Sequence, residues 1–381
     1  MNQTGKKSWW QLWIVMILYF SVGGVCGALI SRYVKAMNET EVTILTILQG
    51  VIVLVIIMYA AYIVQIIIHE AGHLIFGLLT GYKFSSFRIF SFMWVKENGK
   101  LKLKHLSLAG TGGQCLMTPP ELINGKYPYL LYNLGGSITN MITACIFFVI
   151  YIALHNYLFL SYFLLMLSLL GVVSAIINGV PMKLGIINND GYNALSISKN
   201  SLALRSLHMQ MKIHEKNSKG IRLKDMPNEW FEVPTDEAMK NSIIAVSGVF
   251  VCNRLMDECR FKEAQELIHR FLENDTAIVG LHRNLMICDE IYIEIINGGS
   301  EEKIKQLLGK QQKKLMKSMK RYPSVLRTEY AYALLVENDT DKAMKIKSQF
   351  EKISHTYPYQ NDIESERELI EWADKLVLSG K

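Results

Sequence analysis

Long apolar segments occupy the first half of the chain, and charged segments with helical periodicity occupy the second. A helix needs about 20 predominantly apolar residues to cross a bilayer. Four segments meet this requirement, at about Trp9 to Ile30, Val42 to Leu79, Tyr129 to Leu154 and Phe159 to Val180. The uncharged His155-Asn156 turn joins the last two, so we expect these to form an antiparallel hairpin.

The second apolar segment is longer than one crossing requires. At a rise of 1.5 Å per residue, its length exceeds the roughly 30 Å hydrocarbon thickness of a bilayer. We therefore expect this helix to tilt, kink or project beyond the membrane.

The pattern changes to alternation between the second and third apolar segments, as in LKLKHLSL. Asn98-Gly99 is a residue pair that tight hairpin turns favour. We predict a β-hairpin at about residues 82–108, followed by a loop in the Gly- and Pro-rich stretch AGTGGQCLMTPP.

From about Leu195 onward the pattern predicts soluble helices, with breaks at residues 226–234, 298–299, 322–323 and 357–358. Residues 254–274 and 330–358 each read as two helices joined by a short turn, with Ala264 or Ala343 on the inner face. These hairpins indicate either a tetratricopeptide-like repeat or an ordinary helical bundle.

Together these patterns predict a mainly α protein, built as a polytopic bundle of four membrane helices with a small β-hairpin insertion and a C-terminal soluble α-helical domain. The expected domains are an N-terminal membrane helix with its external loop (residues 1–41), a membrane core containing the hairpin (42–194) and a cytoplasmic helical domain (195–381).

The distribution of charge predicts the orientation of the chain. Residues through Gly191 contain 12 Lys and Arg against 6 Asp and Glu, and the rest of the chain contains 29 against 28. Seven basic residues lie between Lys83 and Lys126, which places this region, both termini and the helical domain on the cytoplasmic side. The high Lys, Ile and Asn content points to a bacterial cell membrane. Balanced charge in the second half argues against a nucleic-acid partner.

Candidate chemistry lies in residues 66–77, IIIHEAGHLIFG. On a helix, His69 and His73 are one turn apart on the same side, so both imidazoles can bind one metal ion. Glu70, beside them, can accept a proton from an attacking water and pass it to a leaving amine. Zinc is the expected ion, because its catalytic sites combine three protein ligands with a water.

The alternative interpretation is a packed core helix with incidental histidines. A charge near the bilayer centre costs about 2.5 to 3.5 kcal/mol, so three ionisable groups within five residues favour a ligand or a watered cavity. Asp190, in NGVPMKLGIINNDGYNAL just beyond the fourth span, is the acid placed to be a third ligand, although an Asn-Asp-Gly is often only a turn. Glu97 and Glu121 are the alternative acids, and their positions suit solvated surface groups.

The combination of HEAGH in a membrane helix with Asn-x-x-Pro and Asp-Gly after a later span resembles the site-2 protease family of intramembrane zinc metalloproteases, over about Val42 to Leu195. The resemblance implies that His69, His73 and Asp190 bind zinc and that Glu70 is the catalytic base.

Further motifs extend the resemblance. Residues 136–140, Gly-Ser-Ile-Thr-Asn, are similar to the Gly-x-x-x-Asn of the family, which implies that Asn140 hydrogen-bonds a substrate carbonyl or the developing oxyanion. A helix-bridging role is the alternative for Asn140. The chain departs from the family in having eight residues between Pro181 and Asp190, where four are usual, and in lacking a PDZ-like insertion between the third and fourth spans.

The sequence therefore favours an intramembrane zinc endopeptidase that cleaves a transmembrane or membrane-associated peptide or protein near the cytoplasmic face, in regulated intramembrane proteolysis or in the processing of a peptide precursor. The hairpin edge is expected to accept an unwound substrate segment as an added strand. The helical domain is expected to recruit the substrate or bind a regulatory protein.

The alternative from another class is a catalytically inactive membrane scaffold that binds a partner through the helical domain. A membrane-anchored soluble-type zincin would need a downstream His or Glu ligand in a polar setting, which HEAGHLIFGLLTG does not offer. A metal transporter would need a second intramembrane His or acidic cluster, and the sequence shows none.

Overall fold

The computed structural model describes residues 9–37, 43–97, 99–108, 111–184 and 187–378. The chain divides into two compact units. The first contains residues 1–80, 128–183 and 189–194, and the second contains residues 81–127, 184–188 and 195–381. The predicted fold class is confirmed, because the described part consists mainly of helices, four of them strongly apolar, with a small antiparallel sheet.

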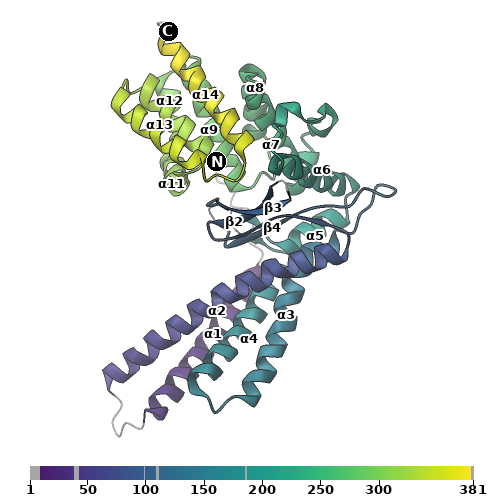
Figure 1. Ribbon diagram of the computed structural model, residues 1–381, viewed down its shortest axis with the longest axis vertical. Coiled ribbons are helices and arrows are strands. Elements are labelled where there is room, and N and C mark those ends of the chain that lie inside the picture. The colour runs from purple at the N-terminus through teal and green to yellow at the C-terminus, as the bar shows by residue number, and fades with distance from the viewer. Residues whose placement is uncertain (1–8, 38–42, 98, 109–110, 185–186, 379–381) are drawn as a thin grey trace. The chain divides into compact units, whose positions relative to one another are not determined.

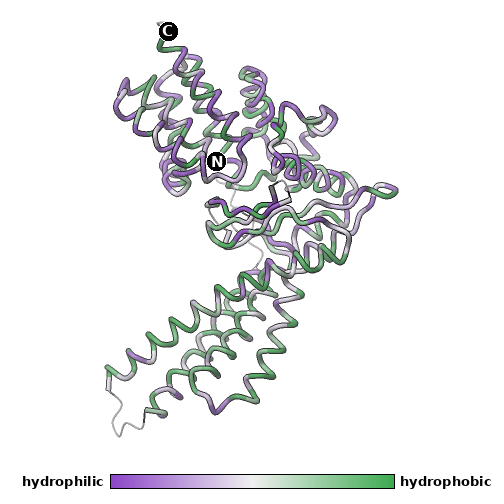
Figure 2. The backbone as a smooth tube through the Cα atoms, viewed as in Figure 1, coloured by the Kyte–Doolittle hydropathy of each residue, from purple (hydrophilic) through white to green (hydrophobic). Residues whose placement is uncertain are grey.

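The first unit is a bundle of four apolar helices, α1 (Trp9–Ala36), α2 (Ile44–Leu79), α3 (Leu130–Ala153) and α4 (Leu158–Gly179) (Figure 1). Each is long and apolar enough to cross a membrane, and Figure 2 shows hydrophobic residues along nearly their whole length. The four predicted spans are confirmed as helices of this kind, and α3 and α4 form the predicted hairpin. The first helix is longer than predicted, since it continues beyond Ile30.

Helix α2 is one helix of 36 residues, which corresponds to about 54 Å at the α-helical rise. It begins after Thr43, whose side chain accepts a hydrogen bond from the backbone N–H of Thr46. Its C-terminal part carries His69 and His73, so the helix that was predicted to be too long for one crossing is also the helix that positions the candidate chemistry.

Glycines bring α2 and α3 into backbone contact. A Cβ atom at residue 72 would lie 2.4 Å from the carbonyl oxygen of Gly135, and one at residue 135 would lie 2.7 Å from the carbonyl oxygen of Gly72. Only glycine fits at either position without a shift of the helices. Small residues at such crossings let apolar helices pack closely where no water is present to drive their association.

Helix α1 is joined to α4 by a buried hydrogen bond. The Tyr162 hydroxyl, on a side chain that is 2% exposed, donates to the carbonyl oxygen of Leu29 at 2.9 Å. Leu54, Ala61 and Met166 are buried in the same cluster. This bond satisfies a polar group that would be costly to leave unpaired among apolar side chains.

The second unit contains a four-stranded antiparallel sheet in the order β3-β2-β1-β4. Its strands are β1 (Lys83–Ile89), β2 (Phe92–Glu97), β3 (Lys100–His105) and β4 (Gly113–Thr118). The first three lie within the predicted hairpin region, and Gly99 between β2 and β3 has a φ of +79°. Asn98, the other predicted turn residue, lies outside the described residues.

Strand β4 corrects the prediction of a loop over AGTGGQCLMTPP. Its glycines and the following prolines indicate a loop, but the residues between them pair with β1, as in Cys115 with Phe87. Cys115 and Met117 are buried. The alternating burial within a short strand was hidden by the turn residues on both sides.

One face of the sheet packs into the core of the second unit. Met93 and Val95 are completely buried and belong to the same hydrophobic cluster as Phe271 and Tyr292 of the C-terminal helices. The sheet therefore packs with the helical region, whereas the sequence analysis grouped it with the membrane core. The opposite face exposes large apolar side chains, those of Phe92, Trp94, Leu101 and Leu103.

The rest of the second unit is helical. Its α-helices after the short α5 (Asp190–Ser198) are α6 (Ser201–Ser218), α7 (Ser242–Asp257), α8 (Phe261–Glu273), α9 (Gly280–Ile296), α10 (Glu301–Leu307), α11 (Lys310–Ser318), α12 (Pro323–Leu335), α13 (Thr340–Ser354) and α14 (Gln360–Leu378). All four predicted breaks lie between these helices. The pairs α7–α8 and α12–α13 correspond to the two predicted hairpins, with Ala264 and Ala343 completely buried. The tetratricopeptide-like relationship stays a prediction.

Replacing Gly72 with Ala should destabilise the helix bundle by about 1 to 3 kcal/mol, because the added methyl group overlaps α3. Thermal unfolding in detergent, with a chelator present, measures this effect separately from any loss of metal. Gly24→Ala is the matched control, since a Cβ there has no atom within 4 Å. Equal stability of the two variants would contradict the close crossing.

Candidate metal centre

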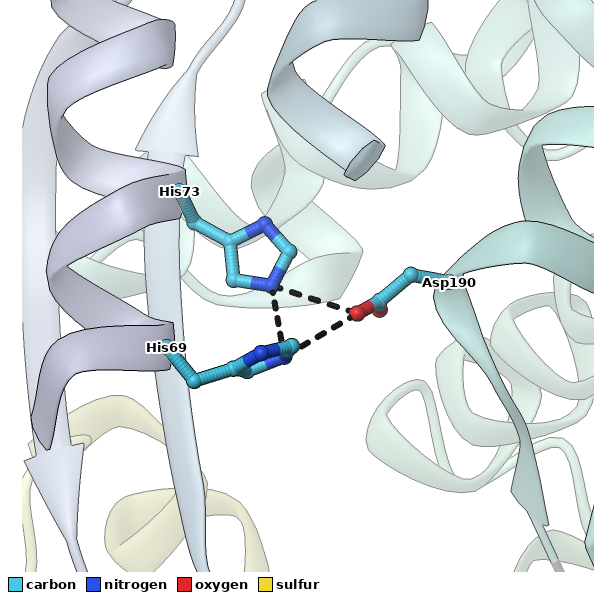
Figure 3. Close-up of side chains that lie close together, drawn as sticks. All are labelled: His69, His73 and Asp190. Atoms are coloured by element: carbon cyan, nitrogen blue, oxygen red, sulfur yellow. Dashed lines mark hydrogen bonds and ion pairs between the residues drawn. The ribbon is translucent and has the colours of Figure 1, made fainter. Parts of the chain in front are cut away.

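Three side chains of the first unit converge on one point (Figure 3). His69 and His73 project from successive turns of α2, and Asp190 reaches them from the first residue of α5. The Nε2 atoms of the two histidines are 3.2 Å apart, and Asp190 Oδ2 lies 3.1 Å from His69 Nε2 and 3.4 Å from His73 Nε2. The three residues that the sequence selected as ligands therefore come together.

The spacing of these three atoms fits a tetrahedral metal ion. Ligand atoms at the usual zinc distances of about 2.0 to 2.2 Å are separated from one another by roughly 3.3 to 3.5 Å in a tetrahedral site. The observed separations of 3.1, 3.2 and 3.4 Å are close to the edges of one face of such a tetrahedron. Two imidazoles and a carboxylate are also a ligand set that suits zinc.

The hydrogen bond of His73 fixes which of its nitrogens faces the centre. His73 Nδ1 lies 2.7 Å from the backbone carbonyl oxygen of Tyr132. A carbonyl oxygen only accepts, so Nδ1 carries the proton and donates it. The Nε2 lone pair is thereby left to face the centre, which is the arrangement that a metal-ligating histidine requires.

His69 is oriented by a chain of two buried amides. Its Nδ1 donates to Asn140 Oδ1 at 2.7 Å, and Asn140 Nδ2 donates to Gln65 Oε1 at 2.6 Å and to the Gln65 carbonyl oxygen at 3.2 Å. Gln65 Nε2 in turn donates to the carbonyl oxygen of Leu167 at 2.6 Å. Because backbone carbonyls accept at two points of the chain, the orientation of both amides and the tautomer of His69 follow from hydrogen-bonding rules.

This chain joins three helices, since Gln65 and His69 belong to α2, Asn140 to α3 and Leu167 to α4. Asn140 is completely buried and Gln65 is 2% exposed. The ring of His69 also needs Gly136, where a Cβ atom would lie 2.5 Å from His69 Cε1. The Gly-x-x-x-Asn segment of α3 thus makes room for His69 and binds its far nitrogen.

The atoms that face one another at the centre are all electron-pair donors, an arrangement that is suited to binding a cation. With both Nδ1 atoms protonated, two imidazole lone pairs and a carboxylate oxygen face one another. At separations of 3.1 to 3.4 Å these acceptors repel one another unless a cation lies between them. A divalent ion would satisfy all three groups.

Asn189 and Gly191 position Asp190 between them. The Asn189 side chain donates to the carbonyl oxygens of Ile177 and Val180 at 2.6 and 2.5 Å, and it accepts from the backbone N–H groups of Met182 and Tyr192 at 3.0 and 2.8 Å. These four bonds fasten the start of α5 to the end of α4. A Cβ at residue 191 would lie 2.1 Å from the carbonyl oxygen of Gly179, so only glycine can follow the ligand here.

The unusual spacing before Asp190 has a structural explanation. The bond from the Met182 N–H to Asn189 closes a loop, and the residues within it include the short paired strands β5 (Lys183–Leu184) and β6 (Ile187–Asn188). The residues beyond the usual spacing thus belong to this loop, while Asp190 is positioned by the contacts of Asn189 and Gly191.

Glu70 follows His69 on α2 and is 7% exposed. It takes part in the electrostatics of the centre, since its charge acts on His73. A buried carboxylate beside two metal-ligating histidines is the arrangement that the HExxH motif predicts.

The two alternative acids lie elsewhere in the chain. Glu121 is a surface group whose side chain is 81% exposed and pairs with Lys212 at 2.5 Å. Glu97 is the last residue of β2, and its side chain lies outside the described part of the structure. Both belong to the second unit, whereas His69, His73 and Asp190 belong to the first.

Gln65 and Asn189 were not among the residues predicted from the sequence, although their hydrogen bonds support His69 and Asp190. Gln65 could have been recognised from the sequence, because it is a lone amide one turn before His69 in an otherwise apolar stretch. Asn189 had no such signal, since an Asn before Asp-Gly is common in turns and its four bonds depend on the fold.

A second group that could hold a cation lies in the second unit, where His269, Glu290 and Glu294 offer ligand atoms within 4.8 Å of one another. The ammonium of Lys303 already donates to Glu294, and His269 pairs with Glu290 at 2.5 Å. This cluster forms an ion-pair network joining α8, α9 and α10, and its cation is supplied by the chain itself.

A comparison with known protein families identifies the family to which the chain belongs. The model of peptidase family M50 matches residues 55–321. The chain belongs to peptidase family M50. This is the site-2 protease family that the sequence motifs resemble. The match extends beyond the membrane bundle into the helices of the second unit. Searches of curated proteins and of solved structures gave no match.

Membership of family M50 places the chain among membrane metallopeptidases, in agreement with its four apolar helices. The side chains that the family motif marks are the ones that converge.

Replacing Asn140 with Leu should weaken zinc binding roughly 10- to 100-fold, because His69 loses the acceptor that fixes its tautomer and orientation. Asn140→Asp should weaken binding less than Asn140→Leu does, since a carboxylate still accepts from Nδ1 although it cannot donate to Gln65. Competition with a chromophoric chelator in detergent measures the affinity.

Thr143→Val is the matched control for this experiment. It lies one turn further along α3 and its hydroxyl donates only to carbonyls of its own helix among the described contacts. If Asn140→Leu bound zinc as tightly as Thr143→Val, the amide chain would have no role in positioning His69.

Proposed function

We propose that this M50 chain is an intramembrane zinc endopeptidase that hydrolyses peptide bonds of a membrane-embedded or membrane-associated substrate near the cytoplasmic face. The observation that carries the proposal is the convergence of His69, His73 and Asp190 beside a buried Glu70 within a bundle of apolar helices. An inert scaffold would have no need to keep three acceptors facing one another at distances of 3.1 to 3.4 Å.

His69, His73 and Asp190 would hold the zinc ion. Zinc bound there supplies Lewis acidity toward a water and toward the scissile carbonyl. Glu70 accepts the proton of the attacking water and delivers it to the leaving nitrogen, so one carboxylate acts first as base and then as acid. Its burial keeps that proton from exchanging freely with bulk water.

The substrate must be unwound before it can react, since a helical peptide bond is shielded by its own hydrogen bonds. We propose that a substrate segment adds to the outer edge of strand β3, the outermost strand of the sheet on that side. The lysines of β3 suit a position near an anionic, cytoplasmic membrane surface. The exposed Leu101 and Leu103 suit an apolar segment that emerges from that membrane. The helical region then recruits the substrate or a regulatory protein.

Glu70→Gln should abolish cleavage while zinc stays bound, because the substitution removes the base and keeps the ligands. A loss of general acid–base catalysis lowers the rate by about 10² to 10⁴-fold. The N-termini of membrane proteins in bacteria that express either form, compared by mass spectrometry, measure the effect and identify the substrates.

The zinc content of both purified proteins is the control for this comparison. New N-termini in or beside transmembrane segments are expected only with the unchanged enzyme. Identical sets of N-termini from two zinc-loaded proteins would support the scaffold instead.

Asn140→Asp separates two roles for this residue. If Asn140 only orients His69, cleavage by the Asp variant should fall no further than its zinc content does, because the acceptor for Nδ1 remains. If the Asn140 N–H groups stabilise the oxyanion, cleavage per bound zinc should fall by about 10² to 10³-fold, as when one oxyanion donor is removed. We expect the first result, since Asn140 Nδ2 already donates twice to Gln65.

A further inference from the structure

The second unit contains a partly open cavity that the proposed hydrolysis does not use. Its volume is about 130 Å³, far more than a single water requires. It lies among α7, α9, the start of α12 and α14, and its lining includes the apolar side chains of Met256, Leu285 and Leu369. The remaining lining is unusually rich in carboxylates and tyrosines.

The charges around the cavity do not balance. Asp257, Asp289, Asp362 and Glu366 line it, against Arg222, and Arg327 is buried beside it. With all of its carboxylates ionised, this group of six would carry an excess of two negative charges.

Each arginine already pairs with two carboxylates. Arg222 bonds Asp257 at 2.5 Å and Glu368 at 2.6 Å. Arg327 bonds Asp289 at 2.6 Å and lies 3.2 Å from Glu366. Asp362 has no cationic partner among the ion pairs of the described residues.

Burial is energetically unfavourable for these carboxylates as anions. It raises the pKa of Asp362 to about 7, against a hydrogen bond from Asn217, and it raises that of Glu366 to about 7, against the charge of Arg327. Both groups titrate where a bound cation would shift them to the ionised form.

One buried acceptor of the cavity lacks a partner. Asn361 is 2% exposed, and its Nδ2 donates to the Asn217 side chain and to the carbonyl oxygen of Ile221. The carbonyl acceptor fixes the orientation of the amide, so Oδ1 is the atom on the other side. That oxygen has no hydrogen-bond partner in the described structure, although Asn361 lines the cavity. The lining therefore includes a residue with an acceptor that no donor of the described residues satisfies.

Aromatic rings complete the surroundings of these acceptors. Tyr322 and Tyr357 both line the cavity, with ring centroids 6.3 Å apart and ring planes at 82°. Ring faces attract ammonium groups, and a corner of two rings beside a carboxylate is a common way to bind one.

We propose that this cavity binds a primary ammonium group on a short aliphatic stem, as presented by a lysine side chain of a polypeptide. The carboxylates, Asn361 Oδ1 and the tyrosine faces match the ammonium, and the apolar lining matches the methylene groups. A hydrated metal ion would gain nothing from apolar and aromatic walls. The partner would thus be a protein or peptide with an accessible lysine, and the inference does not depend on the proposed hydrolysis.

Binding of small probes to the full chain in detergent tests the proposal without any variant. Nα-acetyl-lysine methylamide at millimolar concentration should bind in calorimetry, whereas its Nε-acetylated form and the norleucine analogue should not. Equal binding of the Nε-acetylated form, or no binding of the lysine probe, would overturn the proposal. Tighter binding of cadaverine than of the lysine probe, by about tenfold or more, would assign the cavity to free amines instead.

The pH dependence of the affinity for the lysine probe is an independent test. Lysine stays charged between pH 6 and pH 8 while Asp362 ionises, so affinity for the lysine probe should rise by about tenfold over this range. The other ionisable groups facing the cavity are Arg222, Asp257, Asp289, Glu366, Tyr322 and Tyr357. Asp362→Asn should reduce this rise, leaving the part due to Glu366, and weaken binding at pH 8 by about tenfold.

Asp236→Asn is the matched control, because Asp236 is a surface acid of the same unit that pairs with Arg270. It should bind the probe as the unchanged protein does. A flat pH profile in the unchanged protein, or equal effects of the two variants, would exclude Asp362 from the site.

Discussion

The hydrogen bond from His69 Nδ1 to Asn140 Oδ1 is the interaction on which the metal centre depends. A histidine in an apolar bundle has two nitrogens, and only a fixed partner decides which of them is presented to a metal. Here the partner is held in turn by Gln65, which is bound to the carbonyl oxygen of Leu167. The geometry of one ligand therefore depends on three helices being packed correctly, so the centre is a property of the folded bundle and not of the motif alone.

Close packing is what allows so short a chain of bonds to reach across the bundle. Gly72 and Gly135 remove the side chains that would separate α2 from α3, and Gly136 leaves room for the His69 ring. Because these glycines lie beside the polar residues, steric fit and hydrogen bonding act at the same place. The apolar remainder of each helix provides surroundings in which an unpaired polar group is costly, and this cost favours the one arrangement that pairs them all.

Much of this organisation could be predicted from the sequence because the strongest signals were local. Four apolar segments, a two-histidine motif with helical spacing and Asp190 after the last span are each readable without knowledge of the fold, and all appear in the structure. Strand β4 was missed because its pairing with β1 is a long-range property that its glycines and prolines obscure. The association of the sheet with the C-terminal helices was equally hidden, since it depends on Met93 and Val95 meeting side chains more than 150 residues away in the sequence, such as Phe271. Asn189 could not be recognised because its bonds are made only when α4 and α5 come together.

The loop closed by Asn189 separates the position of Asp190, the proposed third ligand, from the length of the segment that precedes it. Asp190 is located by Asn189 and Gly191, whose contacts are with the end of α4 and the residues next to it. We therefore expect that residues gained or lost between Met182 and Asn189 would leave the carboxylate in place. In evolutionary terms, such a loop would accept insertions and deletions directly beside a residue whose position is fixed.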